Sequence, residues 1–357
     1  MLNKATKPSV KEMRSVWYRV NYHAAFIGFS ILALSNDLFG QTDFDPRVLR
    51  AAREERNINY YGAPELGIAF EPVFKLFQQR YGVEVGFTGA RGRENYDRIL
   101  SEQRAGRHVA DVMSTGATSM NSLKWKGALV PYLPPNLKDI PDAFRDRDHV
   151  LIPVYLNIYG ILINTALVKR DEEPKSWKEL LDSKWKGKIL ADDPRGAGGG
   201  NVWFTVVYKT FGKSYVDAMA RQEPQFRPQY LENEKALARG EFPIYVPAMA
   251  GSMARLKGAP VKWIAPSDGA TYALISQGLI KNGPHPNAAK IWVNFQIGPE
   301  AQTALAEGGN SPLRSDVAVP YPELSFRGIK LLGTTTEEDL KQGAKFSRLA
   351  EQIFFAR

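Results

Sequence analysis

Apolar and polar positions alternate with two different periods between residues 57 and 130. Short apolar runs rich in β-branched and aromatic residues predict strands, and longer segments with an apolar stripe predict helices. Pro72 lies inside the first such stripe, so we expect that helix to be kinked or to start late. Alternation of this kind indicates a parallel sheet covered by helices on both faces. The predicted strands span 57–61, 83–88 and 109–113, and the predicted helices span 66–81, 94–105 and 118–126.

Residues 152–164 form a long apolar stretch that is too β-branched, and too polar at Asn157, for a membrane helix. It predicts one or two buried strands that cross between two lobes. A second α/β unit follows from about residue 165, and 270–281 would return the chain to the first lobe. The predicted elements after 164 are helices at 176–181, 201–211, 231–239, 285–295, from 299 and at 337–354, and strands at 187–192, 243–246 and 261–264.

The first 35 residues have the pattern of an export signal. Five Lys or Arg residues against one Glu give the segment a charge of +4, and an apolar run at 24–34 follows it. Small residues precede a cleavage point after Ser35, and a cut after Gly40 competes with it. The start of translation could be Met13, and an uncleaved signal anchor is the alternative. The apolar run is shorter than the roughly 20 residues of a membrane span.

Composition narrows the classes of function. The chain contains no cysteine, which excludes disulfides, thiolate nucleophiles and the lipid anchor that an exported lipoprotein carries on a Cys. The formal net charge of +9 falls to about +5 without the signal. This charge is spread along the chain, without the concentrated basic patch that nucleic-acid binding requires. We therefore expect no nucleic-acid partner.

Six stretches, in order, carry motifs of a known family: 60–82, 110–112, 176–189 (SWKELLDSKWKGKI), 193–195, 284–302 and 311–317. Over about residues 55–320 the sequence resembles the type 2 periplasmic solute-binding proteins of bacterial ABC importers. The matching branch includes ferric-ion-, thiamine-, phosphonate- and sugar-phosphate-binding members. Each stretch alone is weak evidence for the family, but six stretches in the right order are specific for it.

The resemblance implies a monomeric α/β protein of two lobes, each a mostly parallel sheet with flanking helices, joined by antiparallel hinge strands. It implies closure on a small ligand, then docking to a membrane permease driven by a separate ATPase, with only peripheral contact with the membrane. We assign 57–155 and 275–320 to the first lobe and 156–274 to the second. Residues 321–357 form a C-terminal helical segment whose lobe the sequence leaves open.

The ferric-iron branch of the family implies a His, a Glu and two adjacent Tyr as ligands. The corresponding positions here fall at 62–65, at Gly116 and at 247–251, where none of these ligands stands except Glu65. We therefore expect no metal, with ferric iron as the alternative ligand. A sensor that signals to a membrane receptor is a second alternative, which the sequence does not separate from an importer component.

Several strand-to-helix junctions are suited to an anion, because helix N-termini present unpaired N–H groups and glycines allow close approach. Arginine can grip a carboxylate or phosphate with two bonds. The hinge wall would come from aromatic and amide side chains. The candidate ligand-binding residues are Ala63, Glu65, Arg91, Arg93, Thr115, Gly116, Thr118, Tyr155, Asn157, Arg195, Gly198, Asn201, Tyr245 and Tyr272.

Each candidate has a structural alternative. Arg91 and Arg93 could lie on a solvated turn, Arg195 could brace Asp192 or Asp193, and the threonines could be plain helix caps. Arg314 is interpreted as a bracket for the tail of the chain.

The chain lacks the sequence patterns of a nucleophile elbow, a zinc protease helix, a phosphate-binding P-loop and a dinucleotide fold. We therefore predict neither a catalytic residue nor a cofactor, and a binding protein rather than an enzyme.

Overall fold

The computed structural model describes residues 44–64 and 66–356. One mixed sheet runs through this part of the chain in the order β2-β1-β3-β10-β5-β8-β6-β7. β1 is parallel to β2 and β3, and β6 is parallel to β7 and β8. The strands are β1 Asn57–Gly62, β2 Glu84–Gly89, β3 Val112–Gly116, β4 Leu129–Val130, β5 Ile152–Asn164, β6 Ile189–Asp192, β7 Gln225–Arg227, β8 Ile244–Met249, β9 Val261–Ile264, β10 Ala270–Ile280, β11 Ser311–Pro312 and β12 Leu331–Gly333.

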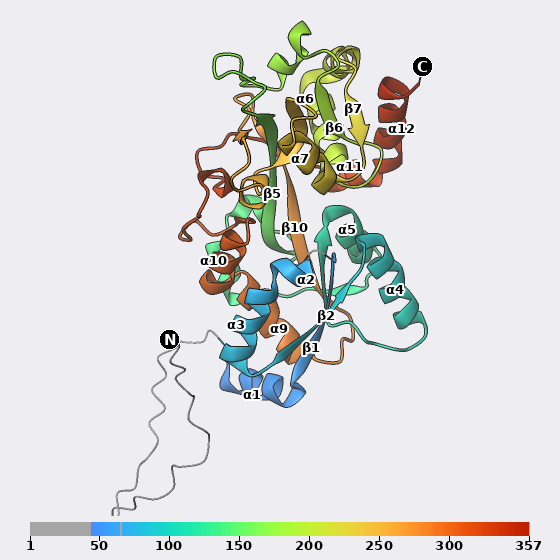
Figure 1. Cartoon of the computed structure of the whole chain (residues 1–357). Helices are drawn as coiled ribbons and strands as arrows, with labels where there is room; N and C mark the ends of the chain where they lie inside the picture. The colour runs from blue at the N-terminus through green and yellow to red at the C-terminus, as the bar shows by residue number, and fades with distance from the viewer. Residues whose placement is uncertain (1–43, 65, 357) are drawn as a thin grey trace, which may run out of the picture. The chain divides into compact units, whose positions relative to one another are not determined.

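Helices cover both parallel groups of strands (Figure 1). We call β1–β3 with α1–α5, α9 and α10 the first lobe, and β6–β8 with α6 and α7 the second lobe. The α-helices are α1 Pro46–Glu55, α2 Leu66–Ala69, α3 Glu71–Tyr81, α4 Gly92–Arg104, α5 Ala117–Trp125, α6 Gly199–Arg221, α7 Tyr230–Ala238, α8 Ser252–Arg255, α9 Pro286–Gln296, α10 Pro299–Glu307, α11 Glu337–Lys341 and α12 Gly343–Phe354. Short 3₁₀ turns lie at Pro135–Asp139, Asp142–Phe144, Lys178–Leu181, Ser183–Trp185 and Pro322–Leu324.

Two long strands, β5 and β10, pass through both lobes (Figure 1). They are antiparallel to each other, β10 pairs with β3 of the first lobe, and β5 pairs with β8 of the second. All positions of β5 except Asn157 are buried, which explains why its sequence is apolar on both faces. The predicted crossover is therefore one strand of 13 residues, and the predicted two-lobed α/β class is confirmed.

The core of the first lobe is built around Trp292 of α9. Its ring lies 5.3 Å from that of Tyr60 on β1 and 5.6 and 5.0 Å from those of Phe74 and Phe77 on α3. The contacts with Tyr60 and Phe77 are edge-on, and aromatic packing of this kind adds to the burial of a large apolar area. Glu55 at the end of α1 caps α9 through the N–H groups of residues 287 and 288. The first lobe is therefore completed by a helix from late in the chain.

The core of the second lobe centres on Trp177 and Trp203, whose rings lie 6.0 Å apart. The indole N–H of Trp177 donates to the carbonyl of Gly269 at 2.8 Å, which fixes the segment before β10. The C-terminal helix packs on this lobe, since Phe354 lies 5.9 Å from Phe204 on α6 and 4.9 Å from Phe226 on β7. The contacts of α12 thus lie with the second lobe.

α11 touches elements of both lobes. Glu337 accepts a hydrogen bond from the indole of Trp125 on α5 at 2.8 Å, and Asp339 pairs with Lys209 on α6 at 2.7 Å. Lys341 lies 5.5 Å from the centre of the Trp125 ring, so a cation–π contact accompanies the hydrogen bond. α11 therefore connects α5 of the first lobe with α6 of the second.

The structure corrects several predicted boundaries. The last helix is not continuous from 337 to 354, because it breaks between Lys341 and Gly343 into α11 and α12. Residues 178–181 form a 3₁₀ turn rather than an α-helix, although Ser176 does accept the predicted cap bond from the N–H of Glu179 at 3.2 Å. The interruption predicted from Pro72 is confirmed, since the helical segment breaks at Phe70 into the short α2 and α3, which begins at Glu71.

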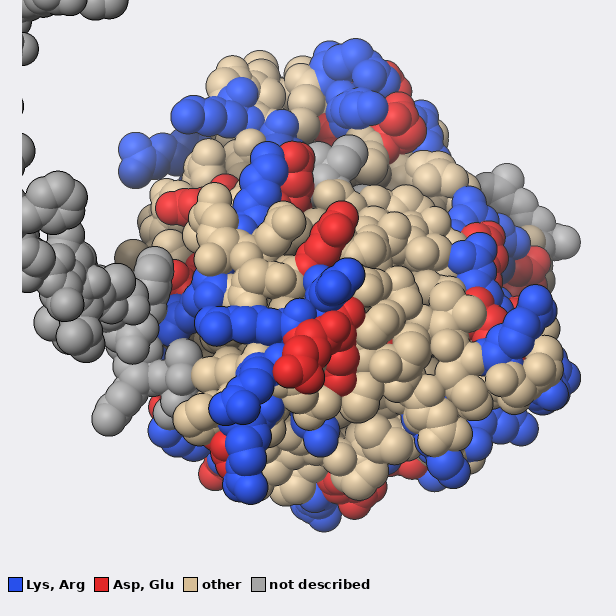
Figure 2. Space-filling model, turned by 90° about the horizontal axis from the view of Figure 1, so that it is seen from below, with Lys and Arg blue, Asp and Glu red and all other residues tan. Residues whose placement is uncertain are grey.

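Charged side chains on the face seen in Figure 2 are of mixed sign, with Lys and Arg lying beside Asp and Glu. Many of the charged pairs are close in sequence, such as Arg93 with Asp97. Exposed pairs of this kind contribute little to stability, but they neutralise the local charge.

Candidate ligand-binding site

The topology brings the carboxyl ends of both parallel groups to the middle of the hinge strands. Gly116, the last residue of β3, lies opposite Ile275 on β10. Tyr159 on β5 lies opposite Met249, the last residue of β8, and opposite Thr271 on β10. The two edges are thus four residues apart along β10, about 13 Å at about 3.3 Å per residue. Ligands of open α/β sheets bind beyond such carboxyl ends.

The first wall of the candidate site is formed where α4 and α5 begin. Gly116 is the N-cap of α5 and makes no side-chain cap bond, so the first N–H groups of this helix remain available. Gly92 at the start of α4 lies against α5, and a methyl group added there would be 2.8 Å from the hydroxyl of Thr115 and 3.0 Å from that of Ser119. Two helix N-termini therefore converge on the hydroxyls of this junction.

Asn95 fixes the ends of the neighbouring strands. It is fully buried, and its amide donates to the carbonyls of Gly62 and Ala90 at 3.0 and 3.1 Å. Ala63, one of the predicted residues, follows directly and is half-buried, and Thr118 is exposed on the first turn of α5. Glu65 lies outside the described residues. The side chain of Asn95 thus fixes the end of β1 and the segment that follows β2 in the first lobe.

The two predicted arginines of this wall differ. Arg93 pairs with Asp97 one turn along α4 at 2.8 Å and lies 5.1 Å from the ring of Tyr96. Arg91 is exposed, and no ion pair holds its guanidinium within the described part of the chain. Only Arg91 is therefore free to meet an anion without breaking an existing pair.

The hinge strands contribute one face of side chains to the site. Tyr155, Asn157 and Tyr159 share a face of β5, because successive side chains on a strand alternate. Tyr272 lies opposite Ile158, and so points to the other face, where its ring lies 6.0 Å from that of Phe144. Burial raises the pKa of Tyr272. Tyr272 therefore does not share a face with Asn157, whereas Tyr159 does.

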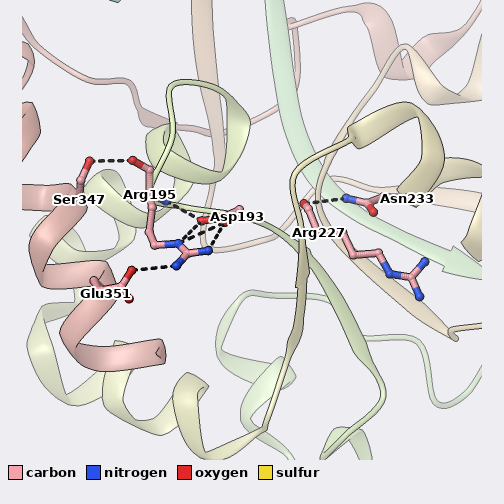
Figure 3. A network of polar contacts seen from close by, with 6 residues as sticks. All are labelled: Asp193, Arg195, Arg227, Asn233, Ser347 and Glu351. Carbon is pink, nitrogen blue, oxygen red and sulfur yellow. Dashed lines mark hydrogen bonds and ion pairs between the residues drawn. The ribbon is translucent and has the colours of Figure 1, made fainter. Parts of the chain in front are cut away.

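Arg195 is engaged in a network at the far end of the second lobe's glycine-rich loop (Figure 3). Its guanidinium pairs with Asp193 at 2.6 Å and with Glu351 on α12 at 2.9 Å, and it lies 3.8 Å from the centre of the Phe355 ring. The carbonyl of Arg195 also accepts a bond from Ser347 at 2.8 Å. These contacts match the structural alternative, in which Arg195 braces Asp193; its role as a ligand clamp stays a prediction.

The glycine-rich loop ends in α6. Gly198 is the N-cap with φ at 144°, a conformation that favours glycine, and no side chain caps the helix there. Asn201 donates its amide to the carbonyl of Pro194 at 2.9 Å, which closes the loop on itself. The loop is therefore shaped by its own contacts.

A carboxylate lies at the start of α6. Asp192, the last residue of β6, accepts bonds from the hydroxyl of Tyr245 at 2.7 Å and from the amide of Asn233 at 2.8 Å. Burial raises the pKa of Asp192 to about 7, although these two bonds lower it. The sequence predicted Tyr245 at the site but read Asp192 only as a brace for Arg195. The one signal for Asp192 was its place at a strand end before a glycine-rich helix start.

Arg314 lies apart from these walls. It is buried and pairs with Asp139 at 2.9 Å and with Asp316 at 2.7 Å, which confirms its interpretation as a bracket for the tail. A small pocket next to it is lined by Pro312, Ser315, Val317, Val319, Ser325, Phe326 and Arg327. This pocket lies beside β11 and not at the strand ends, so we do not place the ligand there.

Comparison with known proteins decides the family. A family model for bacterial extracellular solute-binding proteins matches residues 107–331. The chain belongs to this family. A Salmonella typhimurium protein named as a putative 2-aminoethylphosphonate-binding periplasmic protein is 24% identical over 260 residues, which cover 70% of this chain and 75% of that protein.

Solved structures share the fold of this solute-binding protein. The substrate-binding protein of an ABC transporter from Agrobacterium tumefaciens superposes with a TM-score of 0.72 at 16% identity, covering 84% of this chain and 94% of that one. Iron-bound HitA from Pseudomonas aeruginosa gives 0.66 at 18% identity, covering 82% and 99%. At these identities the likeness concerns the fold.

Membership of the family establishes the general role of the protein but not its ligand. The solute-binding protein is the substrate-binding component of an ABC transporter, acts outside the cytoplasm with a membrane permease, and is not an enzyme. Among the described residues, no helix has the length and apolarity of a membrane span. Within the same residues, no group of His, Asp and Glu side chains gathers in a way that could hold a metal ion.

Proposed function

We propose that the solute-binding protein binds a small organic anion, with a carboxylate, phosphate or phosphonate group, between its two lobes. The observation that carries this proposal is the junction of α4 and α5, where two helix N-termini converge beside the unpaired Arg91. The free N–H groups at the start of α5 favour negative charge, whereas at the start of α4 Glu94 already accepts a hydrogen bond from the backbone N–H of Arg91. The phosphonate named for the Salmonella relative supports the same class of ligand.

The lobes proposed for the clamp are 57–155 with 275–320, and 156–274. The strand pairings support this division, because β5 and β10 change partners near its boundaries. The ligand would then be passed to a permease whose ATPase drives transport. A sensor for a membrane receptor is the alternative with the same binding site.

Ferric iron is a second candidate, because iron-bound HitA has the same fold. The hard Fe(III) ion favours phenolate and carboxylate oxygens. At the end of β8 the chain instead has Pro247, Ala248 and Met249, and Gly116 stands at the end of β3. These residues offer no side-chain oxygen, which favours the organic anion.

Export would depend on residues 1–35, which we propose act as a cleaved signal. Intact-mass measurement of protein recovered from the periplasm of an expressing bacterium should show an N-terminus at Asn36 or Gln41. Recovery of the full-length mass in the membrane fraction would instead indicate an uncleaved anchor.

A pair of neighbouring arginines tests the anion site. Arg91→Ala removes the free guanidinium, whereas Arg93→Ala removes a cation that Asp97 already holds. We expect Arg91→Ala to weaken the binding of 2-aminoethylphosphonate or of a matched carboxylate by roughly 10- to 100-fold, the range of a lost charged hydrogen bond. Isothermal titration calorimetry on periplasmic protein measures both variants.

Arg93→Ala is the matched control and should bind within about twofold of the wild type. Equal losses in both variants would reduce the effect to general surface charge. Binding of ferric iron with none of the organic anions would replace the proposal by the metal alternative.

A further inference from the structure

The second wall of the site, formed by the end of β6 and the start of α6, carries a negative charge. Asp192 ends β6, and one of its oxygens, Oδ1, accepts both bonds from Tyr245 and Asn233. The other oxygen, Oδ2, faces the start of α6, where a methyl group added to Gly199 would lie 3.4 Å away. One side of the carboxylate is therefore held, and the other has no hydrogen-bond donor among the described side chains.

Within the part of the chain that the structure describes, no ion pair neutralises this carboxylate. Arg195 pairs with Asp193 and Glu351, and Arg227 pairs with Glu241 at 3.5 Å. Arg255 pairs with Glu234 at 2.5 Å, and Glu234 also accepts a bond from Ser252. Within the described residues, each nearby arginine thus has another partner and none reaches Asp192. A charge taken out of water without a counter-charge is costly unless a partner arrives.

The surroundings of Asp192 are suited to an ammonium group. Asn233 is fully buried, and its carbonyl oxygen has no hydrogen-bond partner although its amide group is held by Asp192. The ring of Tyr159 lies beside the same spot, since a methyl group on Gly199 would be 2.8 Å from it. An ammonium group has three donors and is attracted to aromatic rings. Glycine at 199 permits this close approach of the Tyr159 ring, because a side chain there would overlap the ring.

We propose that Asp192 receives a cationic ammonium group of the ligand, so that the transported solute is a zwitterion with an anionic group at one end and an amine at the other. This inference rests on the proposed function, because Arg91 and the α4–α5 junction are taken to hold the anionic end. The walls lie on one face of the hinge strands, as the partners of Tyr159 and Gly116 on β10 show.

The distance between the walls limits the ligand. Their backbones are about 13 Å apart along β10, and side chains extend several ångströms inward from each wall. A short chain of a few carbon atoms between the two charged groups therefore fits, as in an ω-amino acid or an aminoalkylphosphonate. Lobe closure would shorten the span further.

Matched pairs of compounds test the inference. Calorimetry compares 3-aminopropylphosphonate with propylphosphonate, and β-alanine with propionate, on wild-type protein and on Asp192→Asn. The asparagine keeps an acceptor for Tyr245 and Asn233 but removes the charge. We expect wild-type protein to bind the amino compounds at least about 30-fold more tightly than their partners. In Asp192→Asn that advantage should fall to within about threefold.

Asp217→Asn is the control, because it removes an equal charge from α6 at a carboxylate that Lys213 already pairs. It should leave the amine preference unchanged. A wild-type protein that binds propylphosphonate or propionate as tightly as the amino compounds overturns the inference and leaves the anion proposal standing. Binding of propylamine without an anionic group would overturn the anion proposal and support Asp192. Failure of all five compounds overturns both.

Discussion

At the residue scale, the chemistry of the site depends on which charges already have partners. Arg93, Arg195 and Arg255 each pair with a carboxylate, whereas among the described residues no ion pair holds Arg91 or Asp192. An ion pair that exists in the free protein must be broken before its arginine can hold a ligand, which costs affinity. Charged side chains without an ion-pair partner are thus the better candidates for ligand recognition. The sequence alone does not show which arginines have such a partner.

The raised pKa of Asp192 has a consequence for stability. Burial is the largest cause, and the nearby carboxylates Glu234 and Asp193 raise the pKa further, against the bonds from Tyr245 and Asn233. A carboxyl whose folded pKa lies above its unfolded value favours the folded state below about pH 4, and this contribution is lost as the pH rises to about 7.

We therefore predict that Asp192→Asn is more stable than the wild type at high pH. The difference in unfolding free energy should be small at pH 4.5 and reach about 2–4 kcal/mol in favour of the variant at pH 8, since each pKa unit corresponds to about 1.4 kcal/mol. Urea unfolding without ligand at both pH values measures it. A difference that does not change with pH would mean that Asp192 titrates normally in the folded protein.

Site residues could be predicted from the sequence where a single strand end decides their place. Gly116 and Thr115 follow an apolar run and precede a helix, so they are recognisable without a structure. The hydrogen bonds of Asp192 cannot be recognised in the sequence, because Asn233 is 41 positions away and Tyr245 is 53 positions away. Nor does the sequence show that Glu351, 156 positions from Arg195, occupies its guanidinium.

At the element scale, long amphipathic or apolar segments were predicted closely and short ones were not. β1, β5, α9 and α10 lie where the patterns place them, because each buries several of its apolar residues. β7 has three residues and β12 has three, and both exist only because a neighbouring strand pairs with them. The break between α11 and α12 follows from tertiary contacts at Trp125 and Lys209, which the helical period does not contain.

The loop before α6 is held to α12 by one side chain, which gives a test of Arg195. Arg195→Ala should lower the free energy of unfolding by about 1 kcal/mol, because the pairs with Asp193 and Glu351 are 40% exposed on the arginine side and are screened. Urea denaturation measures this loss, and ligand affinity should stay within about twofold. A loss of affinity above about tenfold would instead establish Arg195 as a ligand clamp.

At the scale of the whole molecule, the resemblance implied two lobes joined by antiparallel hinge strands, but neither it nor the pattern predicted the order of the strands. Alternating strands and helices indicate two parallel groups, and the apolar run at 152–164 indicates a crossover. The pairing of β10 with both β3 and β5 joins residues far apart in the chain, and together with the pairing of β5 with β8 it makes one sheet of the two groups. Local periodicity cannot specify contacts of that range.

The position of Trp292 in the core of the first lobe has a consequence for how the chain folds. The ring of Trp292 is synthesised more than 200 residues after the aromatic residues that pack around it, Tyr60, Phe74 and Phe77. Glu55 likewise precedes by 232 positions the residue whose N–H group it binds at the start of α9. Contacts of such long range slow folding, because a large loop must close before they form. The first lobe therefore stays incomplete until most of the chain has left the ribosome. A protein that acts outside the cytoplasm gains time in this way to cross the membrane before its core closes.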